Sequence, residues 1–159
     1  MMPGESVPEL MRRTMFNLQF IQNHCGRTGP YEVTQLVNSF LGALAHPWEK
    51  YQRELTAISL ESAYENGWPQ VAPLDPFDEN PVTLGDLIRL MRNGIAHGNI
   101  DFTPDADGEI GLIRIRNIHP RSRRQTWEAI LTVKEMEAFL LKFVEQAEAL
   151  QSAMRGEKS

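Results

Sequence analysis

The segment "TLGDLIRLMRNGIA", residues 83–96, combines an apolar side with a cluster of polar residues. Projected at about 100° per residue, its large apolar residues gather on one face of a helix, which we expect to be buried: Leu84, Leu87, Ile88, Met91 and Ile95. Thr83 and Asp86 have the spacing of a capping box, with Asp in place of the usual Glu, and predict where this helix begins. The segment therefore predicts a helix packed into a core.

Four other segments have apolar residues that fit a helix: 6–25, 31–46, 49–67 and 132–150. We expect the second of these helices to end at His46, because the residue before a proline avoids the helical conformation. Thr132 and Glu135 form another capping box, which predicts the start of a long C-terminal helix. The run 67–81 holds four prolines and several acidic residues, so it predicts an irregular surface loop.

Two runs of strand-like residues, "IGLIRIRNI" and "TWEAILT", precede the C-terminal helix and are separated by "HPRSRRQ". They predict a β-hairpin, and the turn-rich "TPDADGE" connects it to the preceding helix. The predicted fold class is thus mainly α: a bundle of about five helices with a β-hairpin inserted before the last.

The composition limits the kinds of protein this chain can be. With 159 residues, 42% of them hydrophobic, we expect a single domain over 1–159 with its ordered core at 6–155. A single cysteine, Cys25, excludes an internal disulfide framework and favours a reducing compartment, so we expect a cytoplasmic protein. We expect neither secretion nor membrane insertion, since no leader pattern and no apolar run of about eighteen residues occurs.

The formal net charge of -5 does not attract a polyanion, so a nucleic acid would need a local basic patch. Such a patch lies within the predicted hairpin, where a stretch without acidic residues contains Arg114, Arg116, Arg121, Arg123 and Arg124. Strand alternation places the first two opposite the neighbouring isoleucines, on a face that can meet RNA phosphates. The alternative is a solvated hairpin tip that discourages aggregation.

The polar side of the 83–96 helix presents Arg89, Arg92, Asn93 and, just beyond, His97. Asn93 and His97 are one turn apart and therefore neighbours. In an unbroken helix, however, five positions separate Arg92 from His97 by about 140°, so their side chains diverge around the small Ala96.

Two arrangements would bring Arg92 and His97 to a common ligand. The helix loosens at Gly94 or ends near Gly98, or a second copy packs its own Ala96 face against the first across a two-fold axis. We favour the second, which gives a cleft lined by two Arg, two Asn and two His. The plainer alternative is that these side chains are merely solvated.

The motif "RNGIAH", residues 92–97, resembles the R-x4-6-H signature of the HEPN superfamily, in which a polar residue commonly follows the arginine. Together, "LIRLMRNGIAHGNI" and "GPYEVTQLVNSFLGAL" resemble a branch of small HEPN proteins found in bacteria and on their plasmids. The resemblance implies a helical bundle, usually dimeric, and in many members a metal-independent ribonuclease of toxin, anti-phage or RNA-processing systems.

Carried over to this chain, the resemblance makes Arg92 and His97 catalytic, with Asn93 supporting them. In the branch whose toxins are silenced by a nucleotidyltransferase partner, a tyrosine stands two places after the histidine. Here Asn99 occupies that position, which argues against that form of control.

The sequence thus predicts an endoribonuclease that needs no metal or other cofactor and uses the 2′-hydroxyl of RNA as nucleophile. We expect Arg89 and the five hairpin arginines to bind RNA. The expected partners are RNA, a second copy of the chain, and an antitoxin or defence-system protein, as suits a toxin or defence effector. The alternative is a non-catalytic HEPN module that binds RNA or a nucleotide.

Overall fold

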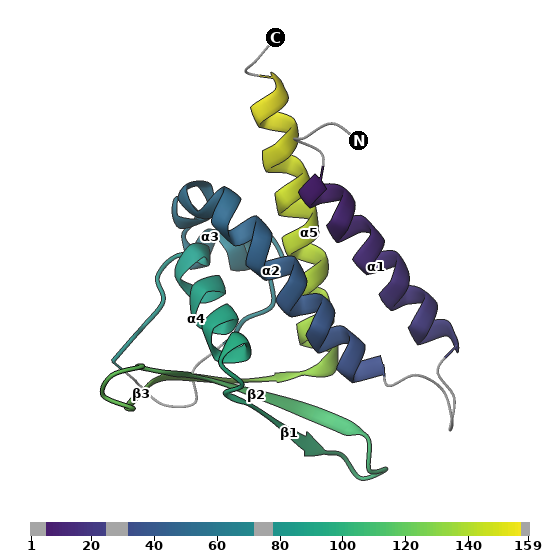
Figure 1. Ribbon diagram of the computed structural model, residues 1–159. Coiled ribbons are helices and arrows are strands. Elements are labelled where there is room, and N and C mark those ends of the chain that lie inside the picture. The colour runs from purple at the N-terminus through teal and green to yellow at the C-terminus, as the bar shows by residue number, and fades with distance from the viewer. Residues whose placement is uncertain (1–5, 25–31, 72–77, 157–159) are drawn as a thin grey trace.

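The computed structural model describes residues 6–24, 32–71 and 78–156. In chain order its elements are α1 (Ser6–His24), α2 (Glu32–Thr56), α3 (Leu60–Glu65), α4 (Leu84–Ala96), β1 (Ile100–Pro104), β2 (Ile110–Ile118), β3 (Gln125–Thr132) and α5 (Val133–Gly156). The predicted fold class, mainly α with a small β element before the C-terminal helix, is confirmed (Figure 1).

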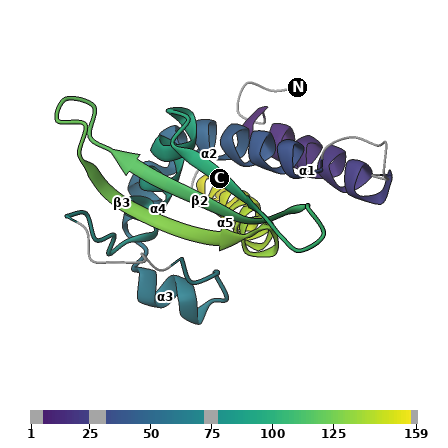
Figure 2. The same ribbon diagram turned by 90° about the horizontal axis from the view of Figure 1, so that it is seen from below.

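The helices lie on one side of a small antiparallel sheet (Figures 1 and 2). α2 is central among them and contacts α1, α4 and α5, while α4 also packs on β2. Buried apolar side chains of the helices and of one sheet face form the core, with Phe40, Phe139 and Trp127 among the largest. None of the elements that the structure describes covers the other face of the sheet (Figure 2).

The predicted end of the second helix at His46 is wrong, because α2 continues through Pro47 to Thr56. A proline inside a helix removes one backbone hydrogen bond and bends the helix without having to end it. Four residues beyond the proline the helix is kinked at Tyr51, whose backbone is non-helical, with φ -115° and ψ 16°. Trp48, Tyr51 and Leu55 are buried beyond the proline, so core packing keeps the second half of the helix in place.

The third helix expected over 49–67 is accordingly divided between two elements. Its first half belongs to α2, and only Leu60–Glu65 forms the separate helix α3. The side chain of Ser59 caps α3 by accepting the backbone N–H of Ser62 at 3.1 Å. The start of α4 lies beside the start of α3, because their N-cap residues, Thr83 and Ser59, form an isolated β-bridge.

The predicted hairpin is confirmed as β2 and β3, but a third strand, β1, was missed and pairs with β2. Its register places Ile100 opposite Ile115 and Phe102 opposite Ile113. The run "IDFTP" is short and ends in proline, so it has little tendency to form a strand by itself. Pairing with β2 stabilises it as a strand. The predicted turn follows, where Asp105 Oδ1 accepts the backbone N–H groups of Asp107 and Glu109.

Candidate functional site

The helix α4 carries the candidate site and begins as predicted. Thr83 Oγ1 accepts the backbone N–H of Asp86 at 3.1 Å, and the Asp86 carboxylate accepts the backbone N–H of Thr83 at 3.1 Å. All five apolar residues of the predicted core face are buried, and Leu90 is buried beside them. Burial of this broad face fixes the rotation of α4 and therefore the direction of its polar side chains.

Two glycines allow α4 to lie directly on its neighbours. A Cβ atom on Gly85 would lie 2.6 Å from Thr56 Oγ1, at the end of α2. A Cβ atom on Gly94 would lie 2.5 Å from Ile115 Cγ2 and 2.8 Å from the carbonyl oxygen of Arg116, both on β2. The helix continues through Gly94, so this glycine permits close packing and does not loosen the helix.

The C-terminus of α4 is a Schellman motif, so the helix ends near Gly98, as the first of the two arrangements considered for Arg92 and His97 allowed. The N–H of Gly98 donates to the carbonyl of Ile95 at 3.0 Å, and the N–H of Asn99 donates to that of Gly94 at 2.8 Å. Gly98 has φ +69°, a conformation that glycine adopts without strain. His97 is the C-cap residue, so the histidine of the motif stands at the point where the helix stops.

Arg92 is half-buried, and its Nη2 lies 3.5 Å from Glu49 Oε1 on α2. Glu49 is 70% exposed and Arg92 30% exposed, so the ion pair lies at the surface between the two helices. Sequence reasoning missed Glu49, since no local pattern connects it to a residue 43 positions away. Within the described residues, Arg92 is thus held loosely, by one partner.

Asn93 is half-buried, whereas Ala96, His97 and Gly98 are exposed. The side chains of Asn93 and His97 make no hydrogen bond or ion pair within the described ranges of the chain. At the C-terminal end of α4, the described residues thus give neither the half-buried Asn93 nor the exposed His97 a polar partner, while the Arg92 guanidinium lies by Glu49 on α2.

Most of the arginines predicted to contact RNA lie beside acidic residues. Four ion pairs involve them: Arg89 with Glu79, Arg114 with Glu128, Arg116 with Asp101, and Arg124 with Asp78. Arg121 and Arg123 have no such partner in the part of the chain that the structure describes. The basic sequence patch is therefore largely neutralised on the sheet, and its unpaired charge remains at the hairpin tip.

The strand alternation itself is confirmed. Ile113 and Ile115 are buried, while Arg114 is exposed and Arg116 half-buried on the opposite face. That opposite face is the side of the sheet that no described helix covers (Figure 2). On that face, Arg114 pairs with Glu128 of β3 and Arg116 pairs with Asp101 of β1. The sequence of β2 alone does not reveal these ion pairs.

The hairpin tip has a defined backbone. The N–H of Arg123 donates to the carbonyl of His119 at 2.9 Å, and the N–H of His119 donates to that of Arg124 at 2.8 Å. His119 Nδ1 accepts the N–H of Ser122 at 3.2 Å. These bonds keep Arg121 and Arg123 at the end of the β2–β3 hairpin.

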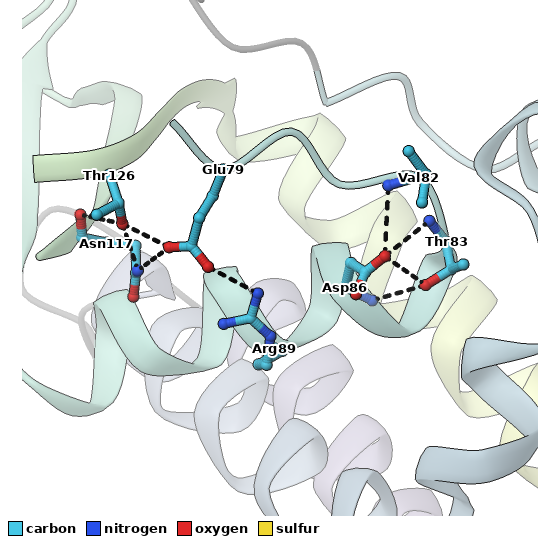
Figure 3. A network of polar contacts seen from close by, with 7 residues as sticks. All are labelled: Glu79, Val82, Thr83, Asp86, Arg89, Asn117 and Thr126. Atoms are coloured by element: carbon cyan, nitrogen blue, oxygen red, sulfur yellow. Dashed lines mark hydrogen bonds and ion pairs between the residues drawn. The ribbon is translucent and has the colours of Figure 1, made fainter. Parts of the chain in front are cut away.

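A second polar cluster, also missed from the sequence, surrounds Glu79 (Figure 3). Its carboxylate accepts hydrogen bonds from Arg89 at 2.9 Å, from Asn117 at 2.8 Å and from the hydroxyl of Thr126. Burial raises the pKa of Glu79, but the bonds from Thr126 and Arg89 outweigh it and hold that pKa below its ordinary value. The cluster ties the end of the proline-rich run to both α4 and the sheet.

In the described residues, no group of three or more His, Cys, Asp or Glu side chains lies close enough together to hold a metal ion. Among the helices of the same residues, none is both long and apolar enough to cross a membrane.

The chain matches a known protein family. The family model described as HEPN pEK499 p136 matches residues 2–152. No curated protein and no solved structure matches this chain.

Proposed function

Because the chain belongs to the HEPN pEK499 p136 family, we propose that it is a metal-independent endoribonuclease, acting as a toxin or a defence effector. Its site is formed by Arg92, Asn93 and His97 at the end of α4. The observation that carries the proposal is the exposed imidazole of His97, which has no polar partner among the described residues and stands on a helix end fixed by a Schellman motif. A purely structural histidine needs neither that exposure nor that rigid support.

The three side chains match the requirements of RNA cleavage without a metal. The 2′-hydroxyl of RNA must lose a proton, and negative charge develops on the phosphoryl oxygens. An imidazole exchanges protons near neutral pH, and a guanidinium holds phosphate oxygens with two parallel hydrogen bonds. Asn93, one turn before His97, orients the imidazole or the substrate. The products are a 2′,3′-cyclic phosphate and a 5′-hydroxyl.

The proposed active form is a homodimer. In-line transfer uses a base at the 2′-oxygen and an acid at the leaving 5′-oxygen, whereas the motif contributes one histidine per chain. Ala96, His97 and Gly98 are exposed together, and the small Ala96 lets a second copy approach closely. A two-fold axis beside Ala96 would place two imidazoles and two guanidiniums around one phosphodiester.

The second candidate is an RNA-binding module that cleaves nothing. It is favoured by the unpaired arginines of the hairpin tip, Arg121 and Arg123, which can bind phosphates without any imidazole. Such a module would retain its RNA affinity after loss of His97 and would show no cleavage in any variant.

The deciding experiment incubates the purified protein with labelled RNA in EDTA, alongside His97→Ala, Arg92→Ala and the control His24→Ala. His24 is an exposed histidine on α1 that stacks on Phe20. We expect the wild type and His24→Ala to cleave RNA, and both site variants to be inactive although folded by circular dichroism. DNA of the same sequence should survive, because it lacks the 2′-hydroxyl. Full activity in either site variant would reject the assignment.

A further inference from the structure

The C-terminal half of α2 carries a shallow groove beside the candidate site. Its volume is about 490 Å³, and it is lined by Glu49, Lys50, Gln52, Arg53 and Thr56. Four of these residues, all but Lys50, recur at helical spacing and form one stripe along α2. The groove is open to solvent, and every residue that lines it ends in a charged or polar group, so it suits an extended charged ligand better than a compact apolar one.

The groove runs alongside α4. At one end Glu49 pairs with Arg92, and at the other Thr56 contacts the backbone of α4 at Gly85. Since residue numbers rise along α2 as they fall along α4, the two helices are antiparallel here. A ligand that leaves Arg92 along this stripe therefore follows α2 towards Arg53.

The two cations of the groove differ in their availability. Lys50 Nζ donates to Gln151 Oε1 on α5 at 2.6 Å, in a contact that the Tyr51 hydroxyl shares at 2.7 Å. Arg53 is exposed and forms neither a hydrogen bond nor an ion pair with any residue that the structure describes. It stands four positions after Glu49, beyond the kink at Tyr51, and both residues line the groove.

We propose that this groove binds the RNA backbone next to the phosphate held by Arg92, with Arg53 contacting a neighbouring phosphate. The inference rests on the proposed function and adds a substrate-binding surface to it. The Arg53 guanidinium, which lines the same groove as Glu49, gives the strand a second cationic contact beyond Arg92. The loose pairing of Arg92, and the absence of a partner for Arg53 among the described residues, leave both guanidiniums ready for phosphate.

The test compares Arg53→Gln with Arg53→Lys and with the control Lys134→Gln. Lys134 is exposed at the start of α5, seventeen residues and therefore about 25 Å from Gln151, the α5 residue beside the groove. Binding is measured with labelled single-stranded RNA carrying 2′-O-methyl groups, which lack the nucleophile, at several salt concentrations. Cleavage of unmodified RNA is measured in parallel.

We expect Arg53→Gln to lower the slope of log affinity against log salt by about 0.7, the value for one phosphate contact on a single strand. It should also raise KM while kcat is retained. Arg53→Lys should keep the wild-type slope because it keeps the charge, and Lys134→Gln should match the wild type. Wild-type slope and KM in Arg53→Gln would overturn the groove assignment.

The groove and the proposed function fail in different ways. If Arg92→Ala and His97→Ala lose cleavage while Arg53→Gln behaves as the wild type, the groove assignment is wrong and the nuclease stands. If the wild-type protein neither binds nor cleaves RNA, the proposed function is wrong, and the groove assignment falls with it.

Discussion

Arg92 and Glu49 face each other across α4 and α2 with their charged atoms 3.5 Å apart. This separation exceeds the roughly 2.7–3.2 Å of a normal N–H···O hydrogen bond. Because Glu49 is largely exposed, the pair contributes little to stability, about 0–1 kcal/mol. A phosphate can offer the guanidinium two parallel hydrogen bonds, which Glu49 does not. Under the proposed function, Glu49 occupies the position that a phosphate of RNA would take.

Replacing Glu49 with Gln should strengthen RNA binding about two- to fivefold, because the phosphate no longer competes with a carboxylate for Arg92. The measurement is the affinity for 2′-O-methyl RNA at low salt. Glu65→Gln, on α3, makes the same charge change at an exposed residue without an ion pair in the described chain. Weaker binding by Glu49→Gln would mean that Glu49 positions Arg92 and does not compete for it.

The activity of mixed dimers of wild-type and His97→Ala subunits should be proportional to the square of the fraction of wild-type subunits. If one phosphodiester needs both imidazoles, only wild-type pairs cleave, and an equal mixture keeps roughly a quarter of the activity. The measurement is the cleavage rate after co-refolding at several ratios. A linear decline, with about half the activity at equal mixing, would show that each subunit works alone.

Arg121→Gln combined with Arg123→Gln should reduce the salt dependence of RNA binding, since these guanidiniums have no acidic partner within the described residues. Two lost contacts lower the slope by about 1.4 for a single strand. The matched variant is Arg114→Gln with Arg116→Gln, whose guanidiniums pair with Glu128 and Asp101. We expect this second double variant to change the slope less. Equal slopes in the two double variants would contradict the distinction between unpaired and ion-paired arginines.

Gly94→Ala should destabilise the protein by about 1–3 kcal/mol, because the added methyl group overlaps Ile115 and the Arg116 carbonyl. The measurement is the free energy of unfolding in urea. Gly42→Ala is the control, since nothing lies within 4 Å of its added Cβ, and alanine there should stabilise α2 by up to about 1 kcal/mol. Unchanged stability in Gly94→Ala would show that α4 does not lie this close to β2.

Glu79→Gln should destabilise the protein by about 1–2 kcal/mol at pH 7, because the charged carboxylate accepts three hydrogen bonds. Since the folded pKa of Glu79 is lowered, this stability is fully present above the unfolded pKa of about 4.3. It is lost as the pH falls through the folded pKa. Unfolding in urea from pH 7 to 3 should show the variant approaching the wild type below about pH 4. A constant difference would contradict the charged network.

The parts of this protein that could be predicted from the sequence depend on neighbours within a few positions. The capping boxes at Thr83 and Thr132, the buried face of α4 and the turn at Gly98 each involve one or two helical turns. The alternation of buried and exposed residues along β2 has a period of two residues and could likewise be predicted from the sequence. Backbone geometry decides such features locally, so residue spacing is sufficient to find them.

Only the tertiary structure decided which side chains meet across the chain. Core packing carries α2 past Pro47, β2 makes a strand of residues 100–104, and Glu49 reaches Arg92 from 43 positions away. Glu79 meets Thr126 across 47 positions. No local pattern encodes these contacts, because each depends on how two elements pack after both have formed. The sequence by itself therefore determined where the motif lies, and the packing of α4 on α2 and β2 determined which of its polar groups are exposed and which are paired within the described residues.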